Sequence, residues 1–247
     1  MHPINEPKDR LIFALDMPSG EKALALVDRL KESVGCFKVG LELFIKEGPE
    51  IIKRIKEKTG AGIFLDLKLH DIPATVRLAV AAAGRHPIRF LTVHCEGGPD
   101  MLHAAVEGAV GCPVQLLGVT VLTSMSVESV SAPAGESQHQ ALGTLVDSRV
   151  RMAREAGLHG VVASGLETAR AKNIMGPGQV VVPGIRPEWA LVEGDDQSRV
   201  TTPAQAIKDG ADLIVVGRPI RDAADPEAAA RRIVEEIKGA LADREVI

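Results

Sequence analysis

The segment Phe64–Pro73, with the sequence FLDLKLHDIP, sets ionisable side chains among leucines. Side chains alternate between the two faces of a β-strand, so Asp66 and Lys68 share one face and the leucines around them share the other. In a parallel barrel the leucines would pack against the helices, and the charged pair would point inward at the carboxyl end of the strand, where active sites lie. Because an isolated buried charge is costly, the pair either forms an ion pair that fills the barrel or meets a ligand.

Two more charged residues lie in the apolar runs that precede this segment. Asp16 ends the first run, in ALDMP, and Lys38 lies within the second, in FKVG. An aspartate in such a position is also typical of a turn or a helix cap. Because the first three strands of a barrel are neighbours, these two side chains would extend the pair on the third strand into a row of alternating charge. Fixed charges of this kind can stabilise an anionic intermediate.

Short apolar runs alternate with longer segments of helical spacing along the whole chain, and helical spacing is clear in Glu21–Lys31 and Glu227–Leu241. The repeat of about 31 residues is the size of one βα unit. This pattern predicts a single (β/α)8 barrel, a TIM barrel, over residues 1–247, with a short polar N-terminal segment at about residues 1–9. A doubly wound open sheet is the alternative, since periodicity does not reveal barrel closure. The expected strands are Leu11–Asp16, Cys36–Val39, Gly62–Lys68, Ile88–His94, Val114–Thr120, Gly160–Ala163, Val180–Pro183 and Leu213–Gly217.

The composition excludes several classes of protein. With 45% hydrophobic and 25% charged residues, the chain of 247 residues is typical of globular proteins. A net charge of −4 and an aromatic content of 2% argue against a nucleic-acid-binding surface. Three cysteines without a CxxC pair predict neither a disulfide framework nor a structural zinc site. No signal peptide is visible and no apolar stretch approaches the roughly 20 residues of a membrane span, so we expect a cytoplasmic protein without membrane contact.

Two segments depart from the even rhythm of strands and helices, Ser131–Gln140 and Gly184–Thr202. Loops of this length in a compact domain are usually functional or disordered. Gly217 and Arg218 end the eighth expected strand, and barrels commonly bind phosphate after strands seven and eight. We therefore expect residues 184–199 to fold over a phosphate and close the site. The alternative for Gly217 and Arg218 is a turn glycine followed by a solvated arginine.

The stretch DLKLHDIP at Asp66–Pro73 resembles the signature of the orotidine 5′-monophosphate decarboxylases. The resemblance extends over about residues 10–240, and it has one departure, Ala74, where the family usually carries a polar residue before Thr75. The supporting pieces, in chain order, are Leu15-Asp16, Phe37-Lys38-Val39-Gly40, Leu122-Thr123-Ser124, Pro183-Gly184-Ile185-Arg186 and Val216-Gly217-Arg218.

This resemblance implies a lyase that converts orotidine 5′-monophosphate (OMP) to uridine 5′-monophosphate (UMP) and CO2 in de novo pyrimidine biosynthesis, without a cofactor or a metal. It implies that Lys68 protonates C6 of the pyrimidine, that Asp66 lies against the substrate carboxylate, and that Lys38 holds Asp66 in place. It also implies a homodimer in which Asp71 and Thr75 reach into the partner's site, Asp71 being catalytic as well as substrate-binding. The other implied substrate contacts are Asp16 and Lys38 at the ribose hydroxyls, Thr123 at the pyrimidine edge, Gln197, Gly217 and Arg218 at the 5′-phosphate with Arg186 beside them, and Ile72.

Fixed charge suits this reaction because decarboxylation at C6 leaves a carbanion without an adjacent carbonyl to accept its electrons. His70, His94 and His103 do not have the spacing of metal ligands on one element. Preorganised charge must then stabilise the carbanion. Two unit charges about 4 Å apart interact by about 4 kcal/mol at an effective dielectric constant of about 20.

Two other functions remain open from the sequence. One is a phosphosugar barrel enzyme such as a hexulose-phosphate synthase, which can share the Asp-x-Lys-x-x-Asp pattern and normally uses a divalent metal. The other is a catalytically silent nucleotide-binding barrel.

Outside the charged segment, His94 is interpreted mainly as a packed histidine, Cys95 as a small buried residue and Trp189 as an anchor or a reporter of loop closure.

Overall fold

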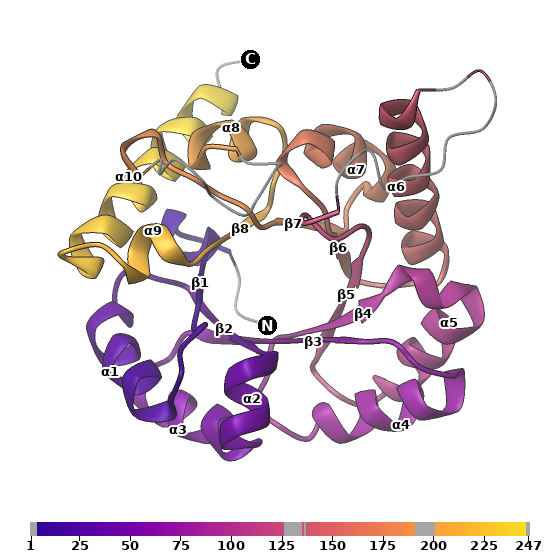
Figure 1. Ribbon diagram of the computed structural model, residues 1–247, viewed down its shortest axis with the longest axis horizontal. Coiled ribbons are helices and arrows are strands. Elements are labelled where there is room, and N and C mark those ends of the chain that lie inside the picture. Colours follow the sequence, from indigo (N-terminus) through magenta and orange to yellow (C-terminus); the bar gives the residue numbers. More distant parts are fainter. Residues whose placement is uncertain (1–3, 126–134, 136, 191–200, 246–247) are drawn as a thin grey trace.

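Eight parallel strands close into a barrel in the order β1 to β8, and β8 pairs with β1 (Figure 1). This computed structural model describes residues 4–125, 135, 137–190 and 201–245. The closed sheet confirms the predicted (β/α)8 barrel and excludes the open doubly wound sheet. The strands are β1 (Leu11–Ala14), β2 (Cys36–Gly40), β3 (Gly62–Leu69), β4 (Phe90–His94), β5 (Gln115–Val119), β6 (Gly160–Val162), β7 (Gln179–Val182) and β8 (Leu213–Val216), each within two residues of its predicted ends.

Helices form a ring outside the barrel (Figure 1). The two helices predicted from apolar spacing are present as α1 and α10, and Ser19 caps α1 by accepting the Lys22 N–H. Within the predicted polar N-terminal segment, residues Pro7–Arg10 form a short 3-10 helix. The α-helices are α1 (Gly20–Leu30), α2 (Leu41–Glu47), α3 (Glu50–Lys58), α4 (Pro73–Ala83), α5 (Gly98–Gly108), α6 (Gln138–Glu155), α7 (Thr168–Met175), α8 (Pro203–Lys208), α9 (Arg218–Arg221) and α10 (Pro226–Glu245).

Apolar side chains fill two layers, one between the strands and the helices and one inside the barrel. On β1, Leu11 and Phe13 belong to the outer layer, whereas Ile12 and Ala14 belong to the inner one. Because both faces of a strand in such a barrel are covered, the strands are almost continuously apolar. Charged residues on the inner faces of these strands are therefore exceptions that need partners.

Strand β3 departs from regular geometry near its carboxyl end. Its pairing with β4 shifts register between Leu65 and Leu69. Lys68 has a φ of 51°, and among the described residues no other non-glycine residue has a positive φ. The strict alternation expected for this segment therefore does not continue through Lys68, although Leu65 is buried and Leu67 and Leu69 pack partly against the outer layer, as expected.

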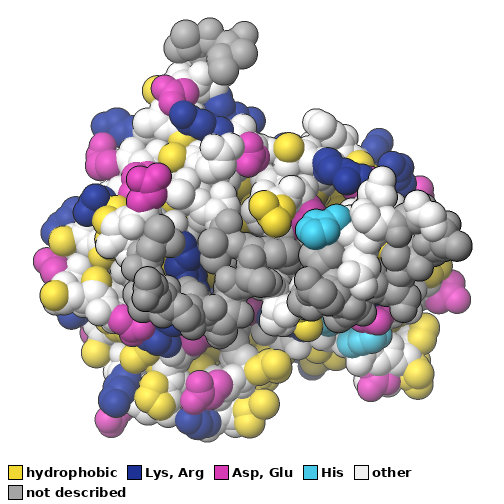
Figure 2. Space-filling model, turned by 45° about the horizontal axis from the view of Figure 1, so that its top comes forward, with side chains coloured by type: hydrophobic (Ala, Val, Ile, Leu, Met, Phe, Trp, Pro, Cys, Tyr) yellow, Lys and Arg dark blue, Asp and Glu magenta, His cyan; other side chains and the backbone are white. Residues whose placement is uncertain are grey.

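The surface carries mixed charge. On the face shown in Figure 2, Lys and Arg side chains are interspersed with Asp and Glu side chains, and the visible described residues form no continuous basic patch. None of the helices in the described part of the chain is long and apolar enough to cross a membrane.

Candidate active site

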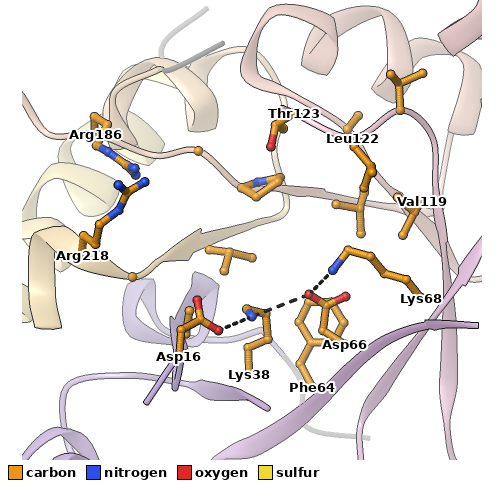
Figure 3. A pocket seen from close by; sticks show the side chains of 18 of the residues that line it. Asp16, Lys38, Phe64, Asp66, Lys68, Val119, Leu122, Thr123, Arg186 and Arg218 are labelled. Carbon is orange, nitrogen blue, oxygen red and sulfur yellow. Dashed lines mark hydrogen bonds and ion pairs between the residues drawn. The ribbon is translucent and has the colours of Figure 1, made fainter. Parts of the chain in front are cut away.

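The carboxyl ends of the strands surround a cavity of about 470 Å³ (Figure 3). Charged side chains on β2 and β3 and just after β1 line one part of it, and arginines that follow β7 and β8 line another part. Apolar side chains such as Val119 and Leu122 lie on the remaining wall. The charged and polar lining residues are Asp16, Lys38, Asp66, Lys68, Thr123, Arg186, Arg218 and Arg221.

Four charged side chains form a row (Figure 3): Asp16 lies two residues after β1, Lys38 lies on β2, and Asp66 and Lys68 lie on β3. Lys38 Nζ lies 3.0 Å from Asp16 Oδ1 and 3.7 Å from Asp66 Oδ2. Lys68 Nζ lies 2.7 Å from the same Asp66 oxygen. The structure thus brings the four residues together with alternating charge. Gly40 leaves room for the row, since a Cβ there would lie 3.1 Å from Lys38 Nζ and 3.2 Å from Asp16 Oδ1.

Asp66 is the most enclosed acid of this row, with only 8% of its surface exposed. Burial by itself raises the pKa of a carboxyl group, but the charges of Lys38 and Lys68 and the hydrogen bonds that Asp66 accepts outweigh burial and lower its pKa. The carboxylate therefore stays ionised at neutral pH. Lys68, with 32% of its side chain exposed against 11% for Asp66, is the more open partner toward the cavity.

A neutral residue also contacts the charge row. The fully buried Thr92 of β4 donates from Oγ1 to Asp66 Oδ1 at 2.9 Å, and its Oγ1 accepts the backbone N–H of Lys68 at 2.9 Å. The sequence pattern does not single out Thr92, because an uncharged threonine in an apolar strand is unremarkable. Only its position gives a signal. Thr92 lies two residues after Phe90, whose side chain belongs to the inner layer, so the alternation of a strand directs Thr92 into the barrel as well.

The far end of the cavity is cationic. Arg186 follows β7 and Arg218 begins α9, and their guanidinium groups point toward the same space (Figure 3). Arg186 is buried and donates from Nη1 to the Ile185 carbonyl oxygen at 3.0 Å. Gly217 also lines the cavity and immediately precedes α9. Two guanidinium groups beside a glycine backbone are suited to an anion such as a phosphate.

Several predicted site residues do not line this cavity. Asp71, Ile72 and Thr75 are exposed near the start of α4, and the Asp71 side chain accepts the Ile72 N–H at 2.6 Å. A single chain therefore does not bring them to the charge row. Gln197 lies outside the described residues.

His94 and Cys95 lie at the end of β4 and do not line the cavity. The His94 ring lies against that of His70, with 5.5 Å between centroids, and burial followed by the His70 charge lowers the pKa of His94. Burial raises the pKa of the Cys95 thiol to about 12, as suits a packing residue rather than a nucleophile. Within the described ranges, no three His, Cys, Asp or Glu side chains are grouped so that they could hold a metal ion.

Trp189 contacts α10 rather than the cavity. Its Nε1 donates to Glu236 Oε1 at 2.8 Å, and the Arg232 guanidinium carbon lies 4.7 Å from the centre of its ring. These two contacts support the interpretation of Trp189 as an anchor over its interpretation as a reporter of loop closure. The anchor lies three residues after Arg186, so it fixes the segment that carries that arginine.

The family model described as "Orotidine 5'-phosphate decarboxylase / HUMPS family" matches residues 9–233. The chain belongs to this family. A relative from Desulfosudis oleivorans named orotidine 5′-phosphate decarboxylase is 52% identical over 238 residues, which cover 95% of this chain and 95% of the relative. A relative of the same name from Bradyrhizobium sp. is 45% identical over 237 residues, covering 96% of this chain and 94% of the relative.

A solved structure gives the same result. The crystal structure of orotidine 5′-phosphate decarboxylase from Lactobacillus acidophilus matches with a TM-score of 0.77 at 35% identity, covering 92% of this chain and 98% of that chain. The family resemblance predicted from DLKLHDIP is therefore confirmed.

Proposed function

We propose that this protein is a carboxy-lyase that decarboxylates OMP to UMP and CO2 in de novo pyrimidine biosynthesis. The observation that carries the proposal is the alternating row from Asp16 to Lys68 at the barrel mouth, in one cavity with Arg186 and Arg218. A nucleoside monophosphate has a dianionic phosphate at one end and its base at the other, which matches this distribution of charge. The names of the relatives support the same substrate.

In the proposed complex the phosphate lies on Arg186, Arg218 and the Gly217 backbone, and Gln197 adds a further contact. The ribose hydroxyls then reach Asp16 and Lys38, and the pyrimidine edge reaches Thr123. This placement brings the C6 carboxylate to Asp66 and Lys68. Binding energy from the phosphate is thereby used to hold the reacting carbon against the charge row.

The chemical step breaks the bond between C6 and the carboxylate carbon, and the electron pair stays on C6 as CO2 leaves. The Lys68 ammonium stabilises this carbanion and then donates a proton to C6, which yields UMP. Asp66 holds the ammonium 2.7 Å away and disfavours the substrate carboxylate beside it. An ammonium about 4 Å from the developing charge contributes about 4 kcal/mol at an effective dielectric constant of about 20.

The proposed mechanism uses no metal and no organic cofactor, which separates it from a metal-dependent phosphosugar enzyme, and it turns over OMP, which separates it from a silent nucleotide-binding barrel. The experiment is to follow the loss of OMP absorbance with the wild-type protein, with and without a chelator. We expect turnover that the chelator does not change. A rate that the chelator abolishes would favour a metal-dependent phosphosugar enzyme, and an absence of turnover would favour a silent nucleotide-binding barrel.

We also propose that the active enzyme is a cytoplasmic homodimer in which Asp71 and Thr75 complete the partner's site. Both residues are exposed in the single chain, and Ile72 between them is a 66% exposed apolar side chain. Leu41 and Ile45 of α2 are also exposed apolar residues. Apolar side chains exposed together with charged ones are typical of an interface.

Mixing two inactive variants tests the shared site. Lys68→Ala and Asp71→Ala are unfolded and refolded together, so that about half of the dimers become heterodimers with one intact site. We expect about a quarter of the wild-type rate per subunit from the mixture and almost none from either variant alone. A mixture as inactive as its components would show that each site is built from one chain.

A further inference from the structure

Strand β3 carries both Asp66 and Lys68, and its backbone between them is irregular. Leu65 pairs with Leu91 and Leu69 pairs with Val93, so four residue steps on β3 lie opposite two on β4. Thr92 is the residue of β4 that faces this longer stretch of β3. Lys68 itself has a φ of 51°, in the left-handed region that is unfavourable for a residue with a Cβ. Such a conformation persists only where surrounding contacts hold it.

One hydroxyl group supplies two of those contacts. Thr92 Oγ1 accepts the Lys68 backbone N–H at 2.9 Å, which gives this amide a partner within the irregular stretch. The same oxygen donates its proton to Asp66 Oδ1 at 2.9 Å. Thr92 is fully buried, so water does not compete for either bond. The Thr92 hydroxyl thus donates a hydrogen bond to Asp66 and accepts one from Lys68, the two charged residues of β3.

The two oxygens of Asp66 are divided between different partners. Oδ1 accepts the Thr92 hydroxyl, whereas Oδ2 faces the ammonium groups of Lys38 and Lys68 at 3.7 and 2.7 Å. Fixing Oδ1 sets the rotation of the carboxylate and so the direction in which Oδ2 holds the Lys68 ammonium. The hydrogen bond to Lys68 N sets the backbone from which the same ammonium extends.

We propose that Thr92 is a positioning residue for decarboxylation, whose single hydroxyl fixes both the Asp66 carboxylate and the backbone that directs Lys68 into the cavity. The inference rests on the proposed function of Asp66 and Lys68. Thr92 does not line the cavity, so it acts through these two residues and not on the substrate.

The test compares Thr92→Val, which keeps the shape and removes the hydroxyl, with Thr92→Ser, which keeps the hydroxyl. We expect Thr92→Val to lower kcat about 10- to 100-fold, the size expected for lost hydrogen bonds to a charged group, with little change in KM. Thr92→Ser should stay within about threefold of the wild type. The acid limb of the kcat/KM profile should move to higher pH in Thr92→Val, because that hydrogen bond helps to lower the Asp66 pKa.

Thr168→Val is the matched control. Thr168 is also fully buried, and its hydroxyl donates to the Ser164 carbonyl oxygen at 3.0 Å, far from the charge row in sequence. We expect this variant to lose thermal stability while kcat and the acid limb stay at wild-type values. If Thr92→Val does not fold, Thr92→Cys replaces it, since a thiol is a weak donor, and its kcat should fall below that of Thr92→Ser.

Three outcomes would overturn the inference. They are a Thr92→Val or Thr92→Cys enzyme with wild-type kcat, a Thr92→Ser enzyme as impaired as Thr92→Val, and an acid limb that does not move. A wild-type protein that does not turn over OMP would instead overturn the proposed function on which the inference rests.

Discussion

Asp66 is the residue on which the charge row converges, since two ammonium groups and one hydroxyl approach its two oxygens. Asp66 and its charged neighbours can be predicted from the sequence because charges within apolar strands require partners. Thr92 and Arg221 cannot be predicted in this way. Thr92 is neutral, and Arg221 reaches the cavity only because α9 begins directly after β8.

His159, an exposed residue that immediately precedes β6, gives a prediction on pH. Its Nδ1 accepts the Leu116 N–H at 3.2 Å, and partial desolvation of the ring lowers its pKa below the usual value of a histidine. Because the pKa of His159 is lower in the folded chain, the unfolded chain binds the proton more tightly. The contribution of the neutral His159 ring to the free energy of unfolding is therefore complete above the pKa of the unfolded chain and is lost as the pH falls through the pKa of the folded chain. We expect the free energy of unfolding, measured by urea denaturation, to fall between about pH 7 and about pH 5.

The variant His159→Gln should show a smaller fall over the same range, because glutamine can accept the N–H without titrating. His86 is half-exposed, its ring makes no hydrogen bond to the described residues, and it serves as the control in His86→Gln. An equal pH dependence in the wild type and His159→Gln would contradict the role given to His159.

At the scale of the elements, the strands could be predicted closely and the irregular parts could not. Alternating βα units give the strands their apolar runs, but the register shift of β3 depends on its pairing with β4, which a single segment does not encode. The anchor of Trp189 likewise depends on α10, which follows it by more than thirty residues. Both features position side chains of the site.

The anchor leads to a prediction for the segment after β7. Glu236→Ala removes the acceptor of the Trp189 N–H, which loosens the segment that carries Arg186. Because Arg186 is proposed to bind the substrate phosphate, we expect KM for OMP to rise about three- to tenfold while kcat stays within about twofold. Steady-state kinetics measure both values.

Glu235→Ala is the control, since Glu235 is an exposed neighbour that pairs only with Lys238, at 3.7 Å, among the described residues. Its KM should match the wild type. A Glu236→Ala enzyme with unchanged KM would show that the Trp189 anchor does not influence phosphate binding.

At the scale of the whole molecule, the barrel gathers one row of charge and two arginines at its carboxyl end. The fold could be predicted because the repeat length matches a βα unit, whereas closure of the sheet is visible only in the structure. The positions of Asp71, Ile72 and Thr75 outside the cavity have a simple explanation in the proposed dimer. A second chain would bring these side chains to the first chain's site.

Replacing Ile72 tests this arrangement. Ile72→Asp places a charge in the proposed interface, so we expect sedimentation to shift from dimer to monomer and the OMP rate to fall at least about tenfold. Leu166→Asp is the matched control, because Leu166 is a 71% exposed apolar residue that follows β6. It should leave the dimer and the rate intact. An Ile72→Asp protein that stays dimeric and active would contradict the proposed interface.

In the proposed mechanism, the ammonium of Lys68, held by Asp66, stabilises and protonates the C6 carbanion. We test this claim by measuring kcat for OMP decarboxylation by Lys68→Ala at saturating substrate, with UMP affinity as the measure of intact binding. Loss of about 4 kcal/mol predicts a fall of about a thousandfold in kcat, with UMP affinity changed less than about tenfold. A Lys68→Ala enzyme that retains kcat within about tenfold of the wild type would contradict the claim.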